Sequence, residues 1–191
     1  GTKLPDQWAP KDARGLAGLS ALLIDKEAPG FTTGRRFLRL GMNGTSSGEL
    51  FFNNCQVDKR NLLGQEGGYM PLGMAMASVG LLGASAIALG VSQAALDPCL
   101  QYGKQREIGG QPLGNYQAVQ FTISEMGVEV EAARRLLYWA VDRLSQRAPG
   151  PPLPAYQAKL FATEMAVRVT DRALQVHRGQ GYTRENPNES C

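Results

Sequence analysis

One long stretch almost without charge constrains this fold more than any other feature. From Tyr69 to Tyr102 the only charged residue is Asp97, and Ala, Leu, Met and Gly predominate. A helix that is apolar on all sides belongs inside a domain, so we expect a buried central helix with a kink at Pro98. Its most apolar part, Val79–Val91, contains Gly and Ser and is shorter than the ~20 residues that cross a bilayer. The stretch therefore predicts a core helix and no membrane span.

Two more helices are predicted after a glycine-rich loop at 108–114. The first covers about 116–147, and its apolar residues recur at the spacing of one helix face. Pro and Gly at 148–152 end it, and a third helix is expected from about Pro154 to Val176. The two stripes consist of Val119, Ile123, Met126, Val130, Leu137, Val141 and Leu144, then Phe161, Met165, Val169 and Ala173.

The residues before Gly68 consist of short apolar runs separated by turns. Strands are expected within Leu19–Asp25, Phe37–Leu40, Glu49–Phe52 and Cys55–Val57. They are too few to close a sandwich or a barrel. The predicted fold class is therefore α+β, in which residues 1–67 form part of a β domain and residues 68–191 form a bundle of long helices.

Composition and charge exclude several classes of protein. The chain carries 20 Lys and Arg against 17 Asp and Glu, and a net charge of +3 argues against a nucleic-acid binder with a dense basic surface. With 43% hydrophobic residues the chain is expected to fold. The cysteines Cys55, Cys99 and Cys191 lack CxxC spacing, so we expect a reducing compartment and neither a zinc site nor a disulfide framework. The single histidine, His177, excludes a two-histidine metal site within this chain.

The residues by themselves offer few candidates for function. Gly179–Tyr182 follows a helix rather than a strand, which favours a helix stop over a dinucleotide-binding loop. His177 lies in the last turn of that helix, where a structural role is favoured. Arg106, before the glycine-rich loop, is a candidate phosphate anchor. Other helical charges are expected to face solvent, namely Glu125, Glu129, Glu131, Arg134, Arg135, Glu164 and Asp171.

Three longer segments carry more specific patterns. Leu40–Tyr69 combines a strand, ELFFNNCQV, with NLLGQEGGY. Tyr102–Gln120 contains Y-x-x-x-R followed, after the glycine-rich loop, by NYQAVQ. Ala158–Thr183 contains AKLFA, Asp171 and LQVHRGQGYT. In this order and spacing they resemble the acyl-CoA dehydrogenase family of flavoproteins, over nearly the whole chain from about Leu19.

The resemblance implies a fold and a cofactor. The family has an N-terminal helical domain, a middle β domain and a C-terminal helical bundle, usually in a homotetramer. This chain would be the end of the middle β domain followed by an incomplete up-down helical bundle. FAD would lie between the β domain and the bundle, with Arg106 facing its pyrophosphate and Gln175 and Gly179 meeting the ADP half of an adjacent subunit's flavin. The implied cofactor-binding residues are Arg106, Tyr116, Gln117, Gln175, Val176, His177, Arg178 and Gly179.

The chain also departs from the family pattern. A phenylalanine of the pattern falls on Gly109, the first glycine of GG-x-GY is Arg178, and a later tyrosine is Asn186. The implied substrate-binding positions are Ser78 and Leu81. Leu81 stands where the family has an arginine that helps to hold acyl-CoA, and its loss argues against ordinary CoA binding.

No catalytic residue is assigned. The family's glutamate base lies, in most members, beyond the position of Cys191, and in the isovaleryl-type branch it falls on Gly80, which has no side chain. Glu185 and Glu189 resemble structural acids of the motif. The chain as written is therefore expected to be a fragment, a truncated product or one component of an assembly, and to have no turnover by itself.

The implied reaction of a complete protein is α,β-dehydrogenation of an acyl thioester in fatty acid metabolism, with electrons passed to an electron-transferring flavoprotein. The expected partners are acyl-CoA or a related thioester and further copies of the chain, as a dimer or a tetramer. The expected location is the mitochondrial matrix or the bacterial cytoplasm. Gly80, Leu81 and Gly109 favour an alternative, a non-catalytic subunit or scaffold that keeps the bundle for assembly. A plain helical interaction module is a third reading.

Overall fold

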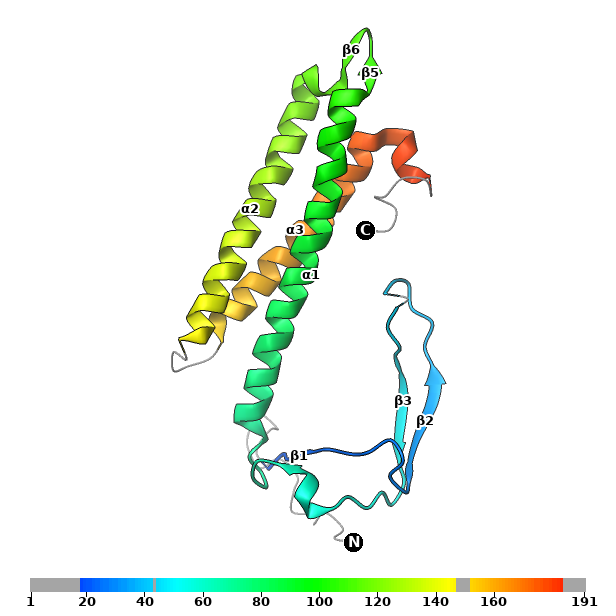
Figure 1. The fold of residues 1–191 in the computed structure, drawn as a ribbon, viewed down its shortest axis with the longest axis vertical. Helices are drawn as coiled ribbons and strands as arrows, with labels where there is room; N and C mark the ends of the chain where they lie inside the picture. The colour runs from blue at the N-terminus through cyan, green and yellow to red at the C-terminus, as the bar shows by residue number, and fades with distance from the viewer. Residues whose placement is uncertain (1–17, 43, 147–151, 184–191) are drawn as a thin grey trace. The chain divides into compact units, whose positions relative to one another are not determined.

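The computed structural model describes residues 18–42, 44–146 and 152–183 (Figure 1). The chain divides into two compact units, Gly1–Gly73 and Met74–Cys191, and each is described by itself. Short strands precede long helices, so the predicted α+β class is confirmed. Several sequence-based expectations lie outside the described residues: the helix end at Arg147, the Pro-rich link up to Pro151, Glu185, Asn186, Glu189 and Cys191.

The first unit contains two small antiparallel pairs of strands. β2 (Phe31–Arg36) pairs with β3 (Gly48–Phe52), and β1 (Ala21–Leu22) pairs with β4 (Leu62–Leu63) after a short 3₁₀ turn. The expected strand at 37–40 is wrong, because the ladder ends where the Phe37 N–H donates to the Ser47 carbonyl at 2.8 Å. Beyond it the chain forms a loop that the Arg39 side chain closes by donating to two backbone carbonyls. No strand forms at 55–57 either.

Three long helices make up most of the second unit. They are α1 (Tyr69–Gln105), α2 (Gln117–Ser145) and α3 (Leu153–His177), close to the predicted boundaries. α1 continues past Pro98 for two more turns. Between α1 and α2 the glycine-rich loop forms a small hairpin, and after α3 the chain makes a 3₁₀ turn, η4 (Arg178–Tyr182).

The core lies where the three helices meet. The buried residues of α1 recur every three or four positions, as Ser85, Ala88, Ser92, Ala95 and Cys99, and this stripe faces apolar residues of α2 and α3. Many of the buried residues are small, which lets the helix backbones approach one another. The fully buried members of the two other helices are Met126, Val130, Ala133, Ala140, Ala155, Ala158, Ala162, Met165, Val169 and Ala173.

The expectation that α1 is buried on all sides is wrong for the described residues. Its opposite face is open, with Val79 72% and Met76 62% exposed. The physical reason is that α2 and α3 cover only one side of α1, along the stripe of small side chains.

The length of α1 also corrects the estimate made from Val79–Val91. The helix has 37 residues and a window of mean hydropathy 1.9, so among the described helices it alone is long and apolar enough to cross a membrane by length and composition. Uncharged Ala, Gly and Met extend the apolar run beyond the short segment. Core helices of water-soluble domains have the same properties, so this feature is weak evidence for a membrane span.

Ion pairs link α2 to α3 on the outside of the bundle. Glu129 was expected to face solvent, but it accepts hydrogen bonds from Arg168 at 3.1 Å and Arg172 at 2.9 Å, and its side chain is only 22% exposed. Arg172 also lies 3.3 Å from Glu125. Arg134 and Arg135 pair with Glu131 on their own helix, as expected for a solvated face.

Candidate cofactor site at one end of the helical bundle

The loop between α1 and α2 is a two-residue hairpin that fixes the backbone of Arg106. β5 (Glu107–Ile108) pairs with β6 (Gln111–Pro112), and the two turn glycines have φ values of 58° and 80°. A two-residue hairpin turn of this type has a positive φ at both central positions, and glycine adopts this conformation without strain. The Arg106 N–H donates to the Tyr102 carbonyl at 2.8 Å, and its carbonyl accepts from the Leu113 N–H at 2.7 Å. The side chain of Arg106 is exposed, so its guanidinium is free to meet a ligand.

The same turn explains why Gly109 departs from the family pattern. A Cβ at Gly109 would lie 2.9 Å from the hydroxyl oxygen of Tyr116, and its φ is positive. That hydroxyl donates to the Ile108 carbonyl at 2.7 Å. A side chain at position 109 would have to move the Tyr116 hydroxyl and hold a positive φ, so this hairpin favours glycine there.

The first turn of α2 presents the positive end of a helix dipole. Tyr116 is the N-cap, its side chain makes no capping hydrogen bond, and the first turn carries no acidic residue. Gln117 is the first residue of the helix and is exposed. Helix N-termini with unpaired N–H groups favour anions, so the Tyr116–Gln117 end of α2 suits a negatively charged group.

Contacts between aromatic rings bring the end of α3 to the end of α1. The ring centroids of Tyr102 and His177 are 4.7 Å apart, and the Cys99 Sγ lies 3.7 Å from the His177 Nδ1. His177 Nδ1 is also 2.9 Å from the Ala173 carbonyl oxygen. Burial raises the pKa of the Cys99 thiol to about 12, so it stays protonated at neutral pH. This packed cluster holds the two helix ends in register.

The cluster also limits what Val176 and His177 can offer a ligand. Both side chains are buried against the chain's own core, with His177 only 3% exposed. Any contact of these two residues with a cofactor would therefore be made by the backbone. Gln175, Arg178 and Gly179 are exposed.

Arg178 ends α3 in a backbone conformation that favours glycine. Its φ is 54° and its ψ is −135°, the mirror image of the extended region. Holding a side chain in such a region costs on the order of 1–3 kcal/mol. A cation at a helix C-terminus gains only about 0.3–1 kcal/mol from the dipole. The dipole of α3 therefore does not account for an arginine at this position.

The two glycines that follow have different roles. A Cβ at Gly181 would lie 2.8 Å from the Leu174 carbonyl oxygen, so the fold itself requires a glycine there. Nothing lies within 4 Å of a Cβ at Gly179, and its φ is not positive. The fold gives no steric reason for Gly179, and this leaves its backbone open to an approaching ligand.

The cofactor candidates thus gather at one end of the bundle, and the substrate candidates lie elsewhere. Arg106 follows Ser78 by 28 residues (106 − 78), which along a helix is roughly 40 Å. Ser78 donates its hydroxyl to the Met74 carbonyl of its own helix, and Leu81 is half-buried. Sequence reasoning assigned no role to Cys99 or to Tyr102 of the Y-x-x-x-R pattern, and these two residues position the ends of α1 and α3. Cys99, Tyr102 and Arg106 are three and four residues apart, the spacing of one helix face, and this was the signal that could have identified them.

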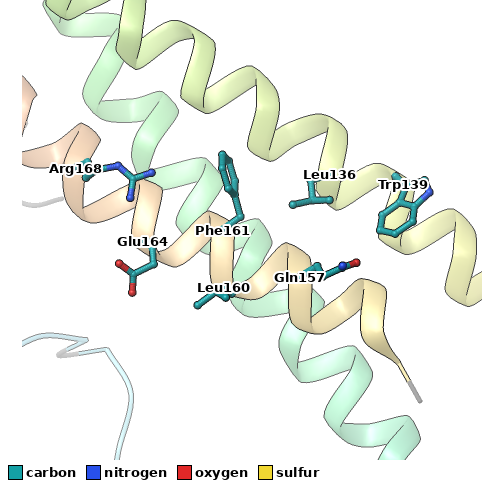
Figure 2. A pocket seen from close by; sticks show the side chains of 7 residues that line it. All are labelled: Leu136, Trp139, Gln157, Leu160, Phe161, Glu164 and Arg168. Atoms are coloured by element: carbon teal, nitrogen blue, oxygen red, sulfur yellow. The ribbon is translucent and has the colours of Figure 1, made fainter. Parts of the chain in front are cut away.

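The grooves of the bundle lie away from the candidate residues. One, of about 620 Å³, runs along α2 and α3, where Phe161 and Trp139 form its apolar lining and Arg168 and Glu164 lie at one end (Figure 2). Another, of about 530 Å³, lies between α1 and α2, where Gln93 bridges Arg134 and Asp97. Within residues 18–42, 44–146 and 152–183 no group of His, Cys, Asp and Glu side chains is arranged to hold a metal ion.

Known proteins are similar to this chain in sequence and in fold. Residues 72–191 match the family described as acyl-CoA dehydrogenase, C-terminal domain. An acyl-CoA dehydrogenase of Bacillus subtilis (strain 168) is 39% identical over 176 residues, which cover 92% of this chain and 46% of that protein.

Solved structures agree with the sequence comparison. Butyryl-CoA dehydrogenase from Megasphaera elsdenii has a TM-score of 0.88 at 34% identity, over 95% of this chain and 47% of that one. A chain in the structure of the electron transferring flavoprotein of Acidaminococcus fermentans has a TM-score of 0.87 at 36% identity, over 93% of this chain and 47% of that one. The chain spans a little under half the length of these relatives.

Proposed function

Since this chain belongs to the acyl-CoA dehydrogenase family of flavoprotein oxidoreductases, we propose that its bundle end binds the ADP half of FAD. The protein that contains it would dehydrogenate an acyl thioester between its α- and β-carbons. FAD, when bound, supplies the acceptor for the two electrons of such a reaction. We propose electron-transferring flavoprotein as the next acceptor, in keeping with the structure of that name that this chain resembles.

The observation that carries the proposal is the gathering of candidate residues from three separate segments. The Tyr102–His177 ring contact joins the ends of α1 and α3. Gly103 and Gly114 are close enough that a Cβ on Gly114 would lie 3.0 Å from the Gly103 carbonyl oxygen, which joins the end of α1 to the start of α2. Arg106, Gln117, Gln175 and Gly179 therefore share one end of the bundle, and all four are exposed.

The chemistry of these groups fits a dinucleotide. The Arg106 guanidinium is a permanent fork of donors that suits a diphosphate. The start of α2 adds the positive end of a helix dipole without a competing acidic side chain. The amides of Gln117 and Gln175 offer both donors and acceptors, and the open backbone at Gly179 permits close approach.

The placement of the substrate candidates suggests how copies of the chain cooperate. Ser78 and Leu81 lie roughly 40 Å along α1 from Arg106, farther than an extended dinucleotide reaches. We propose that the two ends of α1 serve two different flavins, so that FAD is shared between copies of the chain in a homo-oligomer, a dimer or a tetramer. The exposed face of α1 supplies apolar surface for such assembly.

Binding of FAD to purified protein tests the proposal. Arg106→Ala should weaken FAD binding by about 1.5–3 kcal/mol, the range for a hydrogen bond to a charged group. Arg143→Ala is the matched control, because Arg143 is an exposed arginine in the last turn of α2. Equal FAD affinity in the two variants would count against the site.

Sedimentation of the FAD-loaded protein tests whether FAD is shared between copies of the chain. A monomer that retains FAD would contradict this proposal.

The alternative function is a non-catalytic subunit or scaffold. It is favoured by Gly80, which offers no carboxylate to accept the α-proton, and by Leu81, which offers no cation to orient a thioester.

We propose that this chain by itself has no dehydrogenase turnover and that the base is supplied from elsewhere in the protein. Reduction of an artificial electron acceptor with short-, medium- and long-chain acyl-CoA tests this. Turnover by the 191-residue chain would contradict it.

The location proposed for the protein is a reducing compartment, the mitochondrial matrix or the bacterial cytoplasm. Both described cysteines are free thiols, Cys55 half-buried and Cys99 buried.

A further inference from the structure

Arg178 combines a strained backbone with an exposed charge. Three described non-glycine residues have positive φ, and the other two are Met42 and Asn54. Asparagine tolerates such values because its short side chain bonds locally. An arginine at φ 54° and ψ −135° has no such relief, and glycine would occupy the position without strain. Residues held in such disfavoured conformations cluster at active sites and ligand-binding sites.

The charge of Arg178 is not used inside the described part of the chain. Its side chain is exposed, and no hydrogen bond or ion pair joins it to another described residue. Arg172, two turns earlier, is by contrast held by Glu125 and Glu129.

The position of Arg178 places it at the same bundle end as Arg106. Arg178 directly follows His177, whose ring lies 4.7 Å from that of Tyr102. The Tyr102 carbonyl in turn accepts the backbone N–H of Arg106 at 2.8 Å. Two exposed arginines therefore lie near one ring contact, each directly after the last residue of a helix, Arg106 after α1 and Arg178 after α3.

We propose that Arg178 is a phosphate-binding residue, whose guanidinium supplies a second cation beside Arg106 for the diphosphate of FAD. The inference rests on the proposed function and adds a residue that the family pattern fills with glycine. A diphosphate carries more than one negative charge, so two guanidinium groups match it better than one. Arg178 has the backbone conformation that favours glycine, and in our proposal its side chain also binds phosphate.

FAD affinity of four forms of the protein tests this: wild type, Arg178→Gly, Arg178→Asn and Arg178→Lys. The Gly and Asn variants suit the backbone but lack the charge, and we expect each to bind FAD about tenfold more weakly, the usual order for one charge-assisted hydrogen bond. Arg178→Lys keeps the charge and should lose less than threefold. Arg143→Asn, at an exposed arginine of α2, is the control and should leave the affinity unchanged.

Two further measurements separate phosphate binding from a structural role. Unfolding of the flavin-free protein should show a higher midpoint temperature for Arg178→Gly than for wild type, because glycine relieves the strain. ADP should compete with FAD less well in Arg178→Gly than in wild type, whereas adenosine, which has no phosphate, should compete equally in both.

The outcomes distinguish the inference from the proposed function. If wild type binds no FAD, both fail. If Arg106→Ala weakens FAD binding while Arg178→Gly leaves it unchanged, the site stands and the role of Arg178 is overturned. A lower midpoint temperature for Arg178→Gly, with ADP and adenosine affected alike, would also overturn it, because that result describes a residue that only supports the fold.

Discussion

The two ends of α1 differ in how much of their environment the chain itself supplies. At the C-terminal end, Cys99 is fully buried and Tyr102 packs on His177 of α3. At the other end, Val79 is 72% exposed and a Cβ at Gly80 would have no neighbour within 4 Å. The candidate cofactor residues lie at the packed end, and Ser78 and Leu81 lie at the open end.

This difference shows which candidate residues are held in place by this chain's own contacts. Arg106 is held by backbone hydrogen bonds to Tyr102 and Leu113 on its two sides. Ser78 makes one hydrogen bond, to its own helix. Hydrogen bonds within the chain therefore fix the backbone of the candidate residue at the packed end, whereas the described hydrogen bond of Ser78 stays within its own helix.

The largest expected effect comes from a substitution that opens a cavity in the core where the three helices meet. Met165 is fully buried, and Met165→Ala should lower the free energy of unfolding by about 2–5 kcal/mol. Val79→Ala, on the open face, should change it by less than about 0.5 kcal/mol. Chemical denaturation of both variants measures the difference. Similar losses in both variants would show that the exposed face of α1 is packed as tightly in solution as the core.

A second effect appears at alkaline pH. The folded state keeps the Cys99 thiol protonated up to a pKa of about 12, while the unfolded chain loses this proton near 9.0. Between these values the unfolded state binds fewer protons, so stability falls as the pH rises, by at most about 1.4 kcal/mol per pH unit.

Cys99→Ala removes this titration and should flatten the pH dependence relative to wild type. Urea denaturation at pH 9, 10 and 11 gives the two slopes, and the difference between them isolates the contribution of Cys99. Parallel slopes in wild type and variant would mean that the C-terminal end of α1 opens to water.

The smallest effects are expected at two glycines, with opposite signs. A Cβ at Gly114 would lie 3.0 Å from the Gly103 carbonyl oxygen, so Gly114→Ala should destabilise the packed end by about 1–2 kcal/mol. Gly90 is a helix-interior residue with open space around it, so Gly90→Ala should stabilise α1 by about 0.5–1 kcal/mol. Thermal unfolding measures the midpoint temperature of each variant. If both variants were stabilised, or both destabilised, the distinction between packed and open surfaces would not hold.

Helices were predicted more accurately than strands, for a physical reason. The apolar stripe around Met126, Val130 and Leu137 repeats over many turns, so α2 was placed within two residues of its observed bounds. In the first unit Phe37–Leu40 alternates like a strand but lies just beyond the ladder, and Phe31–Arg36 forms it instead. A strand depends on a distant partner, and a short alternating run does not reveal which partner it has.

The sequence alone determined the three long helices, the α+β class and the family, because periodic apolar faces and ordered motifs are local properties of the chain. The tertiary structure decided what no local pattern contains. It buried one face of α1 and exposed the other, turned Glu129 toward Arg168 and Arg172, and placed Arg178 in a glycine conformation. Each of these depends on residues far apart in the chain or on a backbone angle, and composition and spacing carry neither.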